Sequence, residues 1–357
     1  MSLERSFFQG LEGRQAVKAV IMAGGQGKRL KAVTGEAPKP MAPLLGRPMM
    51  EHIILLLKKH GFTDICAAVK YRAEDIMDYF GDGSALGVRL QYRVEQEALG
   101  TAGGVKNCAD FYGEEDFLVI SGDAACDFDL SLLMRQHKES RAAVTLALCR
   151  HPEPLSYGLA VTDAGGLVRA FIEKPMWSRV VTDLVNTGIY VVSPRVMELV
   201  PQGRSFDFAK DLFPRLLERD ELLLGAAMEG YWCDVGTPLS YYKCCVDALE
   251  GRLALDMGGA FRPAKAEEEA DPEEQGSVCL DCSCRSRAGL MGALSEAMLD
   301  MGADYSDGIR LRGRRFDLHI SPLARRSAIR IAVSSQDPEF AKELALSAKE
   351  LAEALDL

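Results

Sequence analysis

The sequence predicts an α/β protein: a large domain built on a doubly wound, mostly parallel sheet, followed by a small α+β domain. Three observations support this prediction. Residues 17–23 form an apolar, β-branched run, typical of a buried strand, that stops at a glycine-rich loop. Strand and helix patterns then alternate up to residue 120, which is the pattern of a parallel sheet. The chain has 357 residues, 48% of them hydrophobic, which is enough for a large core and a second, smaller one.

The other elements of the large domain follow from the periodicity of apolar residues. In its first half we expect helices at 48–61 and 74–80 and strands at 64–69, 88–94 and 116–120. In its second half we expect strands at 144–149, 159–162, 167–172 and 185–192, helices at 195–200 and 210–219, a strand pair within 222–233 and a helix at 238–250. Ligands bind at the carboxyl ends of the strands in such sheets, so this half is expected to supply the other wall of a cleft.

Composition divides the chain into four parts. We expect an N-terminal extension at 1–15, the large domain at 16–250, a linker at 251–288 and a C-terminal domain at 289–357. The linker is predicted from the acidic run 266–276, which is too polar to pack. The last part is expected to hold a helix at 290–301, strands at 307–312, 315–320 and 328–334, and a final helix capped by Asp337.

Charge and hydropathy exclude several classes of function. The formal net charge of −10 argues against binding to nucleic acid or to a membrane surface. The sequence contains no run of 18 apolar residues and no signal-peptide pattern. We therefore expect a cytoplasmic protein that acts on small molecules, either as a monomer or as a homo-oligomer. Several of the ten cysteines lie in apolar runs, where reduced thiols are expected.

The glycine-rich loop after the first strand is the first candidate site. Glycines allow positive φ and close approach, so that successive backbone N–H groups can cradle phosphate oxygens, and an arginine there adds a planar cation. Alone, the loop is a weak signal, and it matches neither the dinucleotide pattern G-x-G-x-x-G nor the P-loop pattern. The predicted nucleotide contacts in it are Ala23, Gly24, Gly25, Gly27 and Lys28, followed by Arg29 as a catalytic cation.

The segment Pro38-Lys39-Pro40 makes the signal more specific. Two prolines hold Lys39 in a stiff, extended segment and so place a second cation at the same phosphates. Together the two stretches resemble the signature of the sugar-phosphate nucleotidyltransferases, G-G-x-G-T-R-L followed by P-K-P, with Lys28 in place of the threonine. The resemblance implies a Rossmann-like nucleotidyltransferase fold.

Two aspartates are the expected metal ligands. Asp123 follows the buried run FLVIS, and Asp234 lies in the segment GYWCDVGTP. Each ends a strand, and two such carboxylates are what a Mg²⁺ bound to nucleotide phosphates needs, although Asp123 alone could be a turn residue. In the resembled family the aspartates at these two positions hold the metal. The resemblance therefore implies Mg²⁺ as cofactor and places Asp123 beside the nucleotide.

The segment Glu173-Lys174-Pro175 ends the strand at 167–172. It resembles the family's E-K-P motif, in which the glutamate binds sugar hydroxyls and the lysine binds the sugar 1-phosphate, although a surface ion pair would explain a lone motif. Two further segments resemble the family's sugar contacts. A glycine there allows the backbone to approach a sugar ring, and an asparagine offers a sugar hydroxyl both a donor and an acceptor. The residues concerned are Gly158, Asn186 and Thr187.

The segment LGTAGG at 99–104 can wrap a flat base with backbone groups. Gly100 and Thr101 within it are predicted nucleotide contacts, and motif alignment positions Glu95 for the edge of the base. A carboxylate that accepts from a ring N–H and an exocyclic amine favours guanine. Capping of a helix N-terminus explains Gly100 and Thr101 nearly as well.

The resemblance covers residues 17 to about 250, with five motifs in the family order, and is closest to bacterial mannose-1-phosphate guanylyltransferases fused to phosphomannomutase-like segments. The tail, with its Asp307-Gly308-Ile309-Arg310 segment, resembles the last domain of phosphohexomutases but lacks their serine-phosphate loop, so no mutase turnover is expected. Cys279, Cys282 and Cys284 lack the spacing of a zinc site, and we expect them in a disordered linker.

The implied reaction joins a nucleoside triphosphate and a sugar 1-phosphate to an NDP-sugar with release of pyrophosphate. Arg29, Lys39 and Lys174 would act by alignment and charge neutralisation. GTP and mannose 1-phosphate are the favoured substrates. The alternatives are UTP or dTTP with glucose 1-phosphate, and a non-catalytic regulator that binds a nucleotide sugar.

Overall fold

The structure is a computed structural model that describes residues 17–176, 180–256, 277–298, 301, 303–305, 308–313, 316–323 and 326–356. The expected N-terminal extension at 1–15 and residues 257–276 of the expected linker lie outside the described residues.

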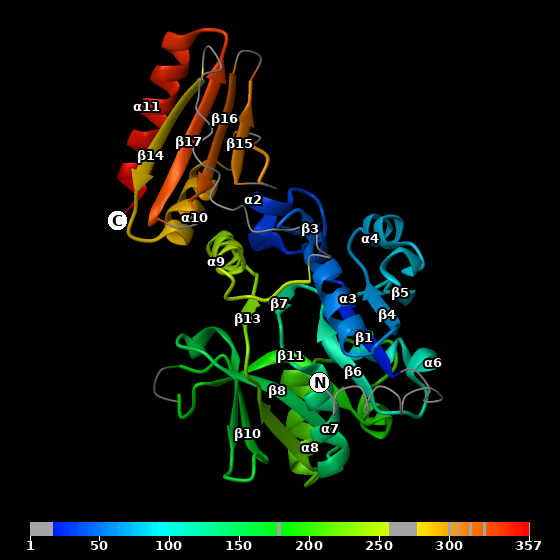
Figure 1. Ribbon diagram of the computed structural model, residues 1–357. Helices are drawn as coiled ribbons and strands as arrows, with labels where there is room; N and C mark the ends of the chain where they lie inside the picture. Colours follow the sequence, from blue (N-terminus) through cyan, green and yellow to red (C-terminus); the bar gives the residue numbers. More distant parts are fainter. Residues whose placement is uncertain are drawn as a thin grey trace, which may run out of the picture.

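A nine-stranded sheet forms the centre of the large domain (Figure 1). Its path runs through β10 (Val168–Glu173), β9 (Gly158–Thr162), β11 (Leu184–Val192), β6 (Phe117–Ser121), β1 (Lys18–Ala23), β4 (Asp64–Val69) and β5 (Arg89–Val94), and β8 (Val144–Arg150) joins β11 to β12 (Leu223–Ala227). The strands β1, β4, β5 and β6 are parallel, whereas β11 runs antiparallel to β6, β8 and β9. The expected α/β sheet is confirmed, parallel in its first half and mixed in its second.

Helices cover both faces of this sheet, because side chains alternate between the faces. In β1, Ala19 and Ile21 pack into one core, and Val20 between them packs into the other. The first core includes α3 (Met49–Lys59), α4 (Ala73–Phe80) and α7 (Leu130–Ser140), and the second includes α5 (Gly100–Lys106), α6 (Ala109–Tyr112) and α8 (Phe213–Glu218). Among the described helices, none combines the length and the apolar character needed to cross a bilayer.

Three predictions for the second half need correction. The expected helix at 195–200 is the 3₁₀ turn η6 (Pro194–Leu199), and the helix expected at 210–219 begins as the π-helical turn η7 (Phe208–Leu212) before α8. The strand pair expected within 222–233 does not form. β12 pairs in parallel with β8, and β13 (Trp232–Asp234) pairs with β7 (Ala124–Cys126). Burial of Leu223 and Ala226 in the main cores favours the large sheet over a local hairpin.

Among the residues that the structure describes, the C-terminal domain consists of a four-stranded antiparallel sheet and two α-helices. The strand order is β14 (Ser277–Ser283), β17 (Ala328–Ser335), β16 (Phe316–Pro322) and β15 (Ile309–Arg312), and the helices are α10 (Arg287–Ala297) and α11 (Pro338–Leu355). Asp337 caps α11, as expected, by accepting from the backbone N–H groups of Glu339 and Phe340. The small α+β domain is thus confirmed, and its resemblance to phosphohexomutases stays a prediction.

The predicted linker, 251–288, is wrong at its C-terminal end. Residues 277–283 are strand β14, and α10 begins at Arg287. The strand forms because its alternate residues enter the core beneath α11, where Cys282 is only 2% exposed. Cys284 is also buried and Cys279 is exposed, so these three cysteines belong to the folded domain.

The C-terminal domain packs against two segments of the large domain. Helix α10 lies on α9 (Pro238–Leu249) and touches α2 (Lys31–Thr34), as Figure 1 shows for the orange and red domain. A single apolar core joins Leu30 and Val235 to Leu294. The approach is close, because a Cβ on Gly292 would lie 3.1 Å from the Cα of Leu239. The domain therefore supports the chain directly behind the glycine-rich loop and directly after Asp234.

Candidate functional site

The glycine-rich loop leaves the carboxyl end of β1 and is shaped around Lys39. Gly27 has φ +68° and ψ +40°, and a Cβ there would lie only 2.7 Å from the Cβ of Lys39, so glycine is required. The backbone N–H of Lys39 donates to the carbonyl of Gly25. Pro38 is extended, as predicted, whereas Lys39 itself begins a short 3₁₀ turn, η2 (Lys39–Met41). The lysine stem thus passes directly against the loop that is predicted to hold phosphates.

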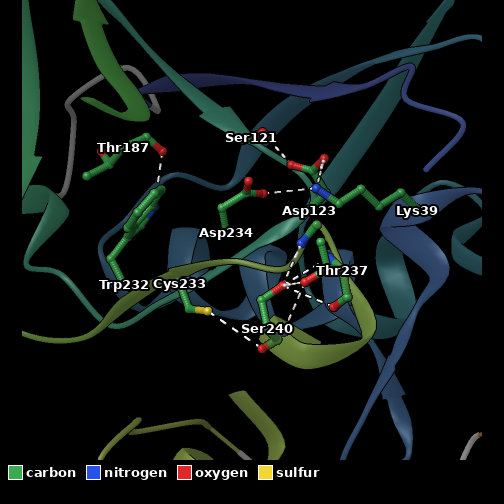
Figure 2. Close-up of polar contacts among 10 residues, drawn as sticks. Lys39, Ser121, Asp123, Thr187, Trp232, Cys233, Asp234, Thr237 and Ser240 are labelled. Atoms are coloured by element: carbon green, nitrogen blue, oxygen red, sulfur yellow. Dashed lines mark hydrogen bonds and ion pairs between the residues drawn. The ribbon is translucent and has the colours of Figure 1, made fainter. Parts of the chain in front are cut away.

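Lys39 brings the two predicted metal ligands together. Its Nζ lies 2.9 Å from Oδ2 of Asp123 and 3.0 Å from Oδ1 of Asp234, and Figure 2 shows the ammonium between the two carboxylates. Ser121 fixes Asp123 from the other side by donating from its Oγ to Oδ1 at 2.5 Å. Burial opposes charge on both Lys39 and Asp123. The ion pairs outweigh it, raising the pKa of Lys39 and lowering that of Asp123, so both groups are charged.

Asp234 is positioned by its own strand and by the helix that follows. It pairs with Ala124 in the short ladder of β13 and β7, which places it one residue along from Asp123 on the partner strand. Thr237 then begins α9 with a capping box, in which its hydroxyl accepts from the N–H of Ser240. Gly236 lies between Asp234 and Arg29: a Cβ there would be 3.2 Å from Nη2 of Arg29. The catalytic arginine predicted from the sequence thus reaches the same place.

The residues predicted to contact the base lie around the start of α5. Glu95 accepts from the N–H of Leu99 through Oε2, and its Oε1 lies against Gly24 and Gly104. Burial raises the pKa of the Glu95 carboxyl. This residue therefore connects the first glycine loop to the LGTAGG segment.

Gly100 and Thr101 carry structural contacts at this helix start. Gly100 has φ +71°, and a Cβ there would meet the carbonyl of Phe206 at 2.8 Å. Thr101 donates from both its N–H and its hydroxyl to Oδ1 of Asp207 and accepts from the N–H of Phe208. The capping alternative considered in the sequence analysis accounts for these contacts.

Strand pairing assembles the predicted sugar-contact segments. Gly158 lies opposite Glu173 in the ladder of β9 and β10, and a Cβ on Gly158 would come within 2.8 Å of Oε2 of Glu173. Lys174 is exposed and has φ +42°, which is strained for a residue with a side chain, and its N–H donates to the carbonyl of Tyr157. The turn therefore fixes the direction in which Lys174 leaves the strand.

Asn186 and Thr187 differ in what their side chains can do. Asn186 donates from its amide to the hydroxyl of Tyr190 and stays partly exposed. Thr187 is 2% exposed and donates from its hydroxyl to the carbonyl of Ala147. The hydroxyl of Thr187 is thus used inside the sheet, where an unpaired hydroxyl would be costly, and the predicted contact of Thr187 with the sugar phosphate stays a prediction that would have to involve its backbone.

An aromatic cluster that the sequence analysis did not single out joins the sugar segments to the carboxylates. The indole N–H of Trp232 donates to the carbonyl of Thr187, and its ring meets that of Tyr157 edge-on at 5.3 Å. Burial, with a smaller contribution from Asp234, raises the pKa of Tyr157 to about 12. The cluster could have been predicted from the sequence, because Trp232 lies two residues before Asp234 and Tyr157 directly precedes Gly158. Through these rings the two halves of the site form one wall.

Asp123 and Asp234 have the chemistry of a magnesium site completed by phosphate. Both carboxylates already face one cation, and Mg²⁺ takes one or two carboxylates and fills its remaining positions with phosphate and water. Among the described residues no group of three or more His, Cys, Asp or Glu side chains is gathered for a metal. The two carboxylates are thus suited to a metal that arrives with a nucleotide.

Comparison with known proteins agrees with this geometry. Residues 18–251 match the family described as nucleotidyl transferase. A UTP–glucose-1-phosphate uridylyltransferase of Synechocystis is 37% identical over 68% of this chain and 64% of its own length, which is less than two thirds of that protein. A mannose-1-phosphate guanylyltransferase of Mycobacterium tuberculosis is 36% identical over 83% of this chain and 79% of its own length.

The solved structures extend the agreement to the fold. The crystal structure of HddC from Yersinia pseudotuberculosis complexed with GMP-PN is 28% identical, with a TM-score of 0.56 over 64% of this chain and 98% of that one. The glycine loop, the two converging aspartates and the mixed sheet thus occur in a chain that belongs to the family of sugar-phosphate nucleotidyltransferases.

Proposed function

We propose that this protein transfers a guanylyl group from GTP to mannose 1-phosphate, giving GDP-mannose and pyrophosphate. The observation that carries the proposal is the convergence of Lys39 on Asp123 and Asp234 beneath the glycine loop, with Arg29 beside Gly236. Two cationic side chains and two carboxylates at one loop are what a triphosphate and its metal require.

In the reaction, an oxygen of the sugar 1-phosphate attacks the α-phosphorus of the nucleotide, and the bond to the pyrophosphate leaving group breaks. The attacking phosphate is already an anion, so the protein needs no side-chain nucleophile. The loop and Arg29 hold and neutralise the triphosphate, and Lys174 holds the sugar phosphate in line with the α-phosphorus. A bound Mg²⁺, held by Asp123 and Asp234, supplies further charge neutralisation at the phosphates.

Two observations favour guanine as the base and mannose as the sugar. Glu95 places a half-buried carboxylate at the LGTAGG segment, and guanine has two adjacent donors, a ring N–H and an amine, for such a group. The relative that aligns over 83% of this chain is named a mannose-1-phosphate guanylyltransferase. A second candidate, UTP with glucose 1-phosphate, is supported by the uridylyltransferase at 37% identity.

The experiment is a substrate matrix. Pyrophosphate release is measured for GTP, UTP, dTTP, ATP and CTP, each with mannose 1-phosphate and with glucose 1-phosphate, in the presence and absence of Mg²⁺. We expect GTP with mannose 1-phosphate to give the highest kcat/KM. A preference for UTP or dTTP with glucose 1-phosphate would overturn the substrate assignment and leave the reaction class standing. Nucleotide-sugar binding without metal-dependent product for any pair would instead favour the regulator.

A further inference from the structure

Lys39 occupies the position between the two carboxylates that a metal would use. Its side chain is 12% exposed, and its Nζ is within 3.0 Å of an oxygen from each aspartate (Figure 2). Mg²⁺ holds its oxygen ligands at about 2.0–2.1 Å, well inside the 2.9 Å and 3.0 Å seen here for the ammonium. The carboxylates therefore hold either the ammonium or a shared metal ion.

We propose that Lys39 is the resident cation of the metal-free site, and that its ammonium leaves the two carboxylates for the triphosphate when metal and nucleotide bind together. The inference rests on the proposed nucleotidyltransferase site. It concerns how the binding of metal is coupled to the binding of nucleotide. Lys39 pairs first with the two carboxylates and then with the triphosphate.

Charge balance supports the exchange. Two carboxylates around a single ammonium leave one negative charge in excess. A divalent cation would neutralise both carboxylates and would release the positive charge of Lys39 at the moment when a triphosphate brings new negative charge. If metal binds to the carboxylates without nucleotide, the ammonium of Lys39 loses both of its ion pairs. This loss is costly because the Lys39 side chain is largely buried.

The backbone geometry allows the ammonium to move while the lysine stays in place. The N–H of Lys39 is bonded to the carbonyl of Gly25, and its Cβ packs against Gly27, so the base of the side chain is fixed to the loop. Beyond the Cβ, three further CH₂ groups can rotate. The ammonium can thus turn from the carboxylates to phosphate oxygens held by the same loop.

The consequence is that metal and nucleotide bind cooperatively in the wild type, and that Lys39 suppresses binding of metal alone. Removal of its charge should therefore improve the affinity of the protein for free metal. If the ammonium did not compete with metal for these two carboxylates, its removal would give no gain in affinity that depends on Asp234.

The test measures Mn²⁺ affinity of the full chain without nucleotide, from the free-ion signal in electron paramagnetic resonance. We expect Lys39→Met to bind Mn²⁺ at least tenfold more tightly than the wild type. The matched control is Lys31→Met, which removes the same charge nearby from a lysine that pairs with the exposed Glu36, and its affinity should equal that of the wild type. Adding Asp234→Asn to Lys39→Met should abolish the gain.

Two results would overturn the proposal: Mn²⁺ binding by Lys39→Met that is no tighter than in the wild type, or a gain that survives Asp234→Asn. If Lys39→Met does not fold, Lys39→Gln replaces it under the same criteria, because its neutral amide still donates hydrogen bonds to the carboxylates. The readout involves no turnover. If the wild type turns over its substrates but Lys39→Met binds Mn²⁺ no more tightly, only this inference is rejected. If Lys39→Met binds Mn²⁺ more tightly but the wild type shows no turnover, only the proposed function is rejected.

Discussion

Replacement of Gly27 by alanine tests whether the glycine loop and Lys39 form one unit. The new methyl group would lie 2.7 Å from the Cβ of Lys39, and the residue would keep a φ of +68°. The left-handed conformation costs about 1–2 kcal/mol for a residue with a Cβ. The overlap adds about 1–3 kcal/mol, as overpacking does in well-packed sites.

Gly46→Ala is the matched control, because Gly46 has φ +79° with nothing within 4 Å of its Cβ position. In urea unfolding, Gly27→Ala should therefore lose about 1–3 kcal/mol more than Gly46→Ala. Relief of the overlap displaces the base of Lys39, and a misplacement of about 1 Å can lower the rate about 100-fold. We expect that loss in kcat for pyrophosphate release, with Gly46→Ala fully active. Equal stability of the two variants with unchanged kcat would refute the reasoning.

Three further predictions concern Glu95, Asp247 and Gly292. The pKa of Glu95 is raised in the folded state, so its stabilising contribution is complete below the ordinary glutamate pKa and is lost as pH rises through the raised value. The unfolding free energy of the wild type should therefore fall relative to that of Glu95→Gln as pH rises from 4 to 7. Parallel curves of unfolding free energy against pH for the two proteins would contradict this. Asp247 is 2% exposed and accepts from Tyr231, Lys243 and Arg252. Asp247→Asn should cost about 1–3 kcal/mol in urea unfolding, because a neutral amide cannot accept all of these hydrogen bonds, and an unchanged unfolding free energy would show that the network is unimportant. Gly292→Leu should force α10 away from the backbone of Leu239 and lower the unfolding free energy by about 1–3 kcal/mol, whereas unchanged stability would show that the two domains are not tightly packed.

Much of the fold followed from local pattern. The strands at 64–69 and 144–149 are buried along their length, and buried strands between helices have a clear signature. Strand β14 was missed because the acidic run before it dominates the composition, and its pairing partner β17 lies far along the chain. Partners of β12 were missed for the same reason: local sequence shows that a strand exists but not which distant strand it joins.

For the candidate site, too, the sequence indicated which residues take part but not how they contact one another. Motif order identified Arg29, Lys39, Asp123 and Asp234, and the structure brings all four together. The direct contact of Lys39 with both carboxylates was not predicted, because spacing indicates a shared site but not which group pairs with which. Thr187 was assigned to the sugar because its segment resembles the family's sugar contacts, and only the packing of β11 against β8 shows that its hydroxyl is used internally.

The central claim is that Asp123 and Asp234 act on one metal ion at the triphosphate. A double-mutant cycle with Asp123→Asn and Asp234→Asn, measured as kcat/KM for Mg²⁺-dependent pyrophosphate release, tests it most directly. If both carboxylates hold the same ion, each single substitution should lower the rate at least about 100-fold, and the double variant should be little worse than the poorer single variant. Additive losses, or a single variant with nearly wild-type activity, would contradict the claim.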